Sequence, residues 1–144
     1  IESITELSNR LDTPLNMSDT TGFLFHEAAS FLQNSTTRLI RGTVRKIGIT
    51  GLKKQMSMVE GFHKICEVGL AGNSALNAAN LHVIMSSINC TYFEYWLPKE
   101  VHQWGVKEQL KINKNGNLDA PTGPGLGIDL DEEWITAHKV TTLS

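Results

Sequence analysis

Short apolar runs alternate along this chain with longer segments whose apolar residues recur at helical spacing. The extended runs cover residues 15–17, 39–44, 65–70 and 92–97, and the helical segments cover residues 4–11, 22–33, 49–62 and 75–88. Strands that alternate in this way with helices are typical of βα units. The pattern therefore predicts the α/β fold class, with a parallel sheet covered by helices.

The pattern changes after residue 108. Residues 109–120 alternate around Asn115-Gly116, which is a strong signal for a two-residue hairpin turn. Asp129 or Asp131 can then cap a last short helix that runs through Trp134 to Lys139. We therefore predict two units, the βα units in residues 1–108 and a tail of hairpin and short helix in residues 109–144.

The composition indicates a globular protein. Of 144 residues, 40% are hydrophobic and 19% are charged, which is enough for one domain with a sizeable core. Thirteen basic and 15 acidic side chains, without a long basic cluster, argue against nucleic acid or an anionic membrane as a partner. No apolar stretch approaches the length of a membrane span and the first residues do not resemble a signal peptide, so we expect a cytoplasmic location. Cys66 and Cys90 lie in or beside apolar runs, and we expect buried, reduced thiols.

Two architectures remain open for the βα units, an open doubly wound sheet and part of a barrel. Neither GxGxxG nor GxxxxGK[ST] occurs in the sequence, so the usual phosphate-binding loops of open sheets are missing. The glycine-rich run 121–127, PTGPGLG, follows the predicted hairpin and is better explained as a surface turn. Periodicity alone does not choose between the two architectures.

Five segments follow one another, in order, over nearly all of the chain: TPLNMSD, VRKIGITGLKK, GNSALNAANLHV, NCTYFEYWLP and PTGPGLGIDLDEEW. This ordered set resembles the C-terminal half of an enolase-superfamily enzyme of the mandelate racemase and muconate lactonizing enzyme type, with the sugar-acid dehydratases most similar. The resemblance implies the C-terminal half of a modified TIM barrel. It also implies that a capping domain, two metal ligands and a lysine-bearing strand lie upstream of Ile1.

The resemblance assigns roles to two acidic residues. Asp19, after PLNMS, falls where the family places its third magnesium ligand, normally a glutamate; the alternative is a helix cap for the segment that follows. Glu94, in YFEYW, matches the glutamate that ends the last barrel strand and hydrogen-bonds the substrate carboxylate as it becomes an enediolate. That role needs a protonated carboxyl, and we expect the flanking aromatic residues to raise the pKa of Glu94 by desolvation if it points inward. The alternative is an outward-facing strand glutamate.

Two positions depart from the family pattern. Thr43 stands where many members place the aspartate of an Asp-His dyad, and Gly69 stands where they place the histidine base. Neither side chain can move a proton. His82 lies within a helical segment, where a packing role is expected. Lys46 and Glu67 are close enough to strand ends to substitute, although solvated or structural roles are favoured for both.

Two functions follow as hypotheses. The first is that the chain is the C-terminal portion of a magnesium-dependent lyase or isomerase that abstracts a proton alpha to the carboxylate of an acid sugar, and that it is inactive in isolation. The second is a non-catalytic binding or scaffold protein that has lost the acid-base dyad. A half barrel exposes strand edges and an apolar inner face. The missing N-terminal half or a second copy of the chain can cover them, or the chain can rearrange into an open two-layer fold, and we expect a second copy first.

Overall fold

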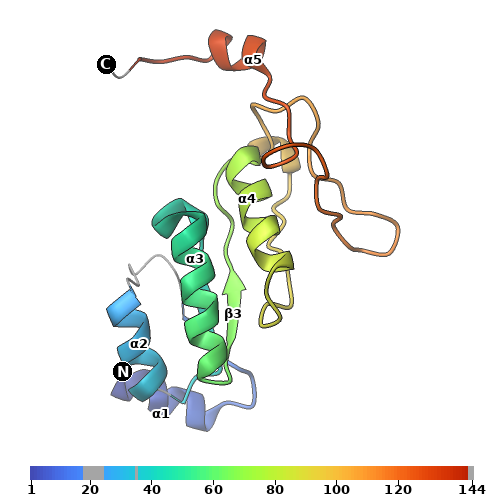
Figure 1. Ribbon diagram of the computed structural model, residues 1–144. Helices are drawn as coiled ribbons and strands as arrows, with labels where there is room; N and C mark the ends of the chain where they lie inside the picture. Colours follow the sequence, from blue (N-terminus) through green and yellow to red (C-terminus); the bar gives the residue numbers. More distant parts are fainter. Residues whose placement is uncertain (18–24, 35, 143–144) are drawn as a thin grey trace.

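The computed structural model describes residues 1–17, 25–34 and 36–142, and Figure 1 shows how the elements are arranged. In chain order the elements are α1 (Glu2–Arg10), β1 (Asn16–Met17), α2 (Phe25–Asn34), β2 (Leu39–Gly42), α3 (Val44–Gly61), β3 (Ile65–Val68), α4 (Ser74–Met85), the short 3-10 helix η2 (Lys99–Val101) and α5 (Glu132–Ala137).

The strands form one parallel sheet in the order β1-β2-β3. Arg41 of β2 lies opposite Glu67 of β3, and a further parallel bridge joins Val68 to Phe93. The predicted parallel βα units are therefore confirmed, and Phe93 extends the sheet by one position. The predicted strand over 92–97 is wrong in its length, because only Phe93 makes a bridge and the chain turns away before the cis peptide bond at Pro98.

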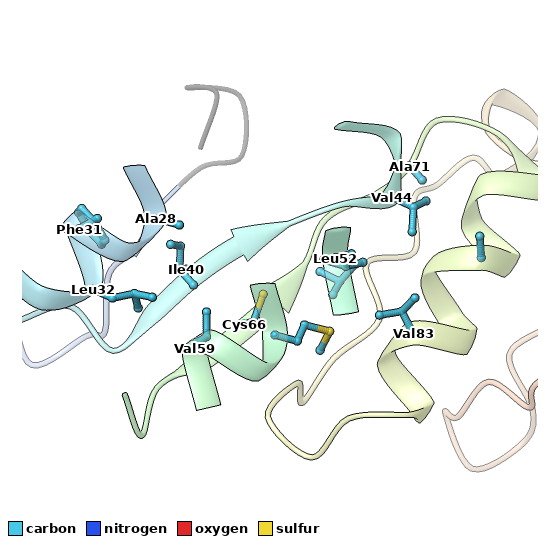
Figure 2. Packing of buried hydrophobic residues seen from close by; sticks show 13 residues of the cluster. Ala28, Phe31, Leu32, Ile40, Val44, Leu52, Val59, Cys66, Ala71 and Val83 are labelled. Atoms are coloured by element: carbon cyan, nitrogen blue, oxygen red, sulfur yellow. The ribbon is translucent and has the colours of Figure 1, made fainter. Parts of the chain in front are cut away.

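The core lies between the sheet and helices α2, α3 and α4. Side chains alternate between the two faces of a strand, so Ile40 and Cys66 both point toward the helices and are completely buried. Figure 2 shows how the side chains of the cluster gather between the strands and the helices. The cluster consists of Ala28, Phe31, Leu32, Ile40, Val44, Leu52, Met56, Val59, Cys66, Val68, Ala71, Ala79 and Val83.

Buried polar side chains fix the loops at the carboxyl ends of β2 and β3. Thr43 caps α3, where its hydroxyl accepts a hydrogen bond from the Arg45 N–H at 3.4 Å. Asn80 of α4 joins the two strand ends, since its Oδ1 accepts from the Val44 N–H at 3.0 Å and its Nδ2 donates to the Gly69 carbonyl at 2.8 Å. A buried amide that makes both bonds holds the two loops in one arrangement.

The tail, orange to red in Figure 1, extends beyond α4, and α5 lies far from α1. Ile112 and Leu118 form an antiparallel bridge, which confirms the predicted hairpin. The predicted two-residue turn is wrong in its length, because the Gly116 N–H donates to the Asn113 carbonyl and the Asn113 N–H donates to the Asn117 carbonyl, so residues 114–116 form a three-residue turn with Gly116 at positive φ. Asp131 caps α5 by accepting a hydrogen bond from the Trp134 N–H at 2.9 Å, which confirms the predicted last helix. The division of the chain at residue 108 stays a prediction. Within the described residues, no helix combines the length and the apolar character that crossing a membrane requires.

Candidate functional site

The sheet face opposite the core carries both apolar and polar side chains, because the half-buried Leu39 and Ile65 share it with Arg41 and Glu67. Arg41 and Glu67 occupy the alternate positions of β2 and β3, and neither side chain is buried against a helix. An open cavity of about 320 Å³ lies at this face. Its lining residues are Asn16, Arg41, Glu67, Val68, Tyr92 and Glu94. The cavity is therefore at the carboxyl ends of the parallel strands, where α/β folds place their binding sites.

Glu94 follows directly after Phe93 and is held by three donors. Its Oε2 accepts a hydrogen bond from the Leu70 N–H at 2.8 Å and forms an ion pair with Nη2 of Arg41. Its Oε1 accepts from the indole N–H of Trp96 at 3.0 Å. With its side chain 32% exposed, Glu94 lies at the cavity with its carboxylate fixed from three directions.

The environment of Glu94 lowers its pKa. Partial burial raises the pKa, but the hydrogen bonds from Trp96 and Leu70 and the charge and hydrogen bond of Arg41 together lower it by more. The expectation of a raised pKa is therefore wrong. The aromatic side chain that we treated as an apolar neighbour, Trp96, donates a hydrogen bond to the carboxylate instead of only desolvating it. Glu94 is ionised at neutral pH.

Gly69 makes room for the guanidinium of Arg41. A Cβ atom at residue 69 would lie 2.6 Å from Nη2 of Arg41 and 3.2 Å from its Cζ. Real Cβ contacts are not this short, so any other residue at 69 requires the guanidinium to move. The place that the family resemblance gives to a histidine base is thus filled by the side chain of Arg41.

The other residues considered for proton transfer have different surroundings. Glu67 accepts hydrogen bonds from the Thr91 and Tyr92 N–H groups, both at 3.2 Å, and so holds the segment that leads to Phe93. Lys46 is exposed on α3. His82 of α4 is half-buried, and its Nε2 lies 3.0 Å from the carbonyl oxygen of Leu126, in the glycine-rich run of the tail. The contacts of Glu67 and His82 are structural ones.

A second, smaller cavity of about 10 Å³ has Glu94 and Trp96 among its lining residues. Three of its lining residues have a buried polar atom without a hydrogen-bond partner among the described residues: Oγ of Ser74, Nε2 of His102 and Oε1 of Gln103. A space of this size is about what one water molecule needs, and three polar atoms are the usual number of partners. The His102 ring also lies edge-on to Trp96, with the ring centroids 4.4 Å apart.

The magnesium ligand expected at Asp19 lies outside the described residues. Within the described residues no three His, Cys, Asp or Glu side chains come together as a metal would require. The two carboxylates that line the open cavity are already engaged, Glu67 by backbone N–H groups and Glu94 by Arg41. The described residues therefore do not fit a magnesium ion by themselves.

The sequence argument did not identify Arg41, Trp96 or His102. A signal for Arg41 exists in the strand LIRG. Arg41 follows the apolar Ile40 directly, so the two side chains are expected on opposite faces of the sheet. No comparable signal exists for Trp96 or His102, which depend on how the chain turns after Phe93. Together, Arg41 and Glu94 form a fixed ion pair that faces an open cavity, and such a pair can bind a ligand by charge.

Comparisons with known proteins agree with the parallel βα fold. The family model for enolase C-terminal domain-like proteins matches residues 1–134. Among solved structures, a candidate mandelate racemase/muconate lactonizing enzyme from Pseudovibrio sp. shares 27% identity at a TM-score of 0.88, over 94% of this chain and 37% of that protein.

Two further structures have the same fold. A mandelate racemase/muconate lactonizing enzyme from Jannaschia sp. CCS1 is 24% identical with a TM-score of 0.80, over 98% of this chain and 36% of that protein. A 2-chloromuconate cycloisomerase from Rhodococcus opacus 1CP is 20% identical with a TM-score of 0.79, over 94% of this chain and 37% of that protein. The chain thus spans little more than a third of the length of these proteins. No curated protein sequence matches the chain.

Proposed function

The chain belongs to the enolase C-terminal domain-like family, and on that premise we propose that it supplies the C-terminal portion of a magnesium-dependent site that abstracts a proton alpha to a carboxylate. The proposed substrate is an acid sugar, and the proposed reaction is dehydration, with racemase-like isomerisation as the second subclass. The observation that carries the proposal is Glu94, which is held at the carboxyl end of the parallel sheet beside an open cavity.

The magnesium ion is part of the proposal through Asp19. When bound, such an ion supplies Lewis-acid stabilisation of an enolate oxygen. The described residues contribute orientation instead. Leu70 N–H, Trp96 and Arg41 hold the Glu94 carboxylate in one position, and Glu67 fixes the chain just before it.

Proton transfer needs a side chain that neither dyad position provides. Thr43 is buried as a helix cap and Gly69 lies under Arg41. An ionised Glu94 can accept a proton but cannot donate one to a developing oxyanion. We therefore expect no turnover from the 144-residue chain by itself.

The filled position at Gly69 favours a second function, a non-catalytic binding protein. In that alternative the ion pair of Arg41 and Glu94 recognises a ligand that is not chemically changed. The two functions agree on a carboxylate ligand and differ only on whether its alpha proton is exchanged.

The test is a panel of acid sugars with magnesium chloride in D2O, followed by proton NMR. We would run it on the 144-residue chain and on any longer product of its gene. The enzyme would be supported if the longer protein exchanges the alpha proton of a substrate or forms a dehydration product, and if the Asp19→Ala variant does neither. Binding without exchange would support the non-catalytic protein, and neither binding nor exchange would contradict both.

A partner for the open sheet face belongs to the same proposal. We propose that the N-terminal half of the barrel or a second copy of the chain covers this face. We also propose that the protein is cytoplasmic. Because this face is covered, the expected species in solution is not a compact monomer. Light scattering together with binding of a hydrophobic dye measures this, and a compact monomer with little dye-binding surface would contradict it.

A further inference from the structure

Arg41 is placed to meet a ligand in the open cavity. It is the third residue of β2, on the sheet face away from the core, and its side chain is 27% exposed. Its guanidinium lies over Gly69, which has no Cβ to obstruct it. The Gln55 side chain also holds this strand position, because its Nε2 donates to the Arg41 carbonyl at 3.1 Å.

The guanidinium has donors to spare. Arginine offers five N–H groups, and within the described residues its only side-chain partner is the Glu94 carboxylate. Nε is buried and has no partner among the described residues, Nη2 is paired with Glu94, and the Arg41 side chain lines the cavity. One carboxylate does not use all of these donors.

The charge of the cavity also depends on Arg41. Glu94 is ionised, and Glu67 is an acceptor for backbone N–H groups, so neither offers a hydrogen to an anion. Arg41 is the one cationic side chain in the cavity lining that the structure describes. A planar guanidinium matches a carboxylate in both charge and geometry, which a single ammonium does not.

We propose that Arg41 is the anion-binding, specificity-determining residue of this cavity, and that its guanidinium binds the carboxylate of the ligand in the role that the family resemblance gave to Glu94. The identity of the ligand as a small carboxylate rests on the proposed function. Glu94 pairs with the guanidinium over Gly69 when no ligand is bound, and it competes with the ligand carboxylate for that guanidinium.

The ion pair has a measurable consequence. The Glu94 carboxylate competes with the anionic ligand for the same guanidinium, and its negative charge repels the ligand. Glu94→Gln therefore tightens anion binding. Removal of the guanidinium weakens it. If the ion pair were purely structural, the guanidinium would not bind the ligand. Neither substitution would then change the affinity for the anion.

The experiment titrates the 144-residue chain with D-gluconate, an acid-sugar anion, in EDTA without magnesium. Binding is followed by the NMR signal of the Trp96 indole N–H, which is hydrogen-bonded to Glu94, and by calorimetry. D-Glucitol is the uncharged matched ligand. We expect Arg41→Gln to weaken gluconate binding at least about tenfold, Arg41→Lys to weaken it less, and Glu94→Gln to tighten it a few-fold.

Lys54→Gln removes the same charge from an exposed position on α3 and is expected to leave binding unchanged. If Arg41→Gln fails to fold by circular dichroism, Gly69→Ala keeps the arginine but displaces it, and must weaken binding instead. Gluconate affinity that is the same in Arg41→Gln as in the wild type, equal binding of glucitol, or no gluconate binding to the wild type would overturn the proposal. Because no turnover is measured, loss of the proposed enzyme activity alone would leave this result standing.

Discussion

The two faces of the sheet differ in kind. On the helix side, Ile40 and Cys66 are completely buried among apolar side chains, and the residues of α3 that face them are equally closed off. On the other side, Arg41 and Glu67 occupy the neighbouring positions of the same strands and remain partly exposed. Successive residues of a strand point to opposite faces, so a residue that stabilises the core lies directly beside one that faces the cavity.

This difference predicts that substitutions on the two faces have separable effects. Changes on the helix side alter the free energy of unfolding, because burial of an aliphatic side chain stabilises a domain by about 1.5–3 kcal/mol. Changes on the open side alter ligand binding with little effect on folding, because partly exposed charges contribute about 1 kcal/mol or less.

The largest expected effect comes from Met56→Ala, in the centre of the helix side. Met56 is completely buried in the core cluster, and its truncation leaves a cavity. We expect the free energy of unfolding to fall by about 2–5 kcal/mol, measured by urea denaturation. Lys54→Ala on the same helix is the control. If the free energy of unfolding fell by less than about 1 kcal/mol, burial on the helix side would not contribute more to stability than the open side does.

Two glycines allow the same change on each face. In Gly42→Ala the new Cβ would lie 2.7 Å from Cδ1 of the buried Leu52, and we expect a loss of about 1–3 kcal/mol. In Gly69→Ala it would meet the flexible end of Arg41, so we expect a smaller loss together with a shifted Trp96 indole signal.

Gly61→Ala, with no atom within 4 Å of the new Cβ, is the control for both glycine variants. Unfolding midpoints and the NMR signal of Trp96 are the measurements. Equal destabilisation by Gly42→Ala and Gly69→Ala, with no change at Trp96, would contradict the comparison.

The pH dependence of stability tests the open face. The pKa of Glu94 is lower in the folded chain than in the unfolded one, so its ionised form stabilises the fold. This contribution, about 1 kcal/mol or less, is complete above the unfolded pKa and is lost as pH falls through the folded pKa. We expect the urea midpoint of the wild type to fall more steeply below pH ~4.3 than that of Glu94→Gln. Parallel curves would show that Glu94 is not held by its three donors.

The last prediction concerns two thiols, Cys66 on the helix side of the sheet and the half-buried Cys90. Burial, and then the charges of Cys90 and Glu67, raise the pKa of Cys66 to about 12, and burial is also the main cause that raises the pKa of Cys90 to about 11. We expect the native protein to react with iodoacetamide at pH ~8 about a hundredfold more slowly than a free thiol, with Cys90 ahead of Cys66. Peptide mass spectrometry measures this, and rapid labelling of Cys66 would show that the core opens.

The sequence pattern was sufficient for the parallel sheet, for a hairpin close to Asn115-Gly116 and for a last short helix, because local spacing and turn chemistry determine these elements. It did not give the three-residue length of the turn or the choice of Asp131 over Asp129 as the cap. The position of Glu94 close to the end of the sheet was expected from the family resemblance, since the pattern alone predicted a strand that continues to residue 97. The sequence argument failed for the state of Glu94, because that state depends on Arg41, 53 residues earlier in the chain, and on the direction of the Trp96 indole. No local pattern encodes contacts of this kind.

The close contact between Arg41 and Gly69 limits how the site can change by mutation. A histidine at residue 69 has no room while the arginine is present, and loss of the arginine alone leaves Glu94 without its counter-charge. The two positions therefore constrain each other, because a side chain at residue 69 and the guanidinium of Arg41 would occupy the same space. Substitutions at residues 41 and 69 are thus expected to be non-additive.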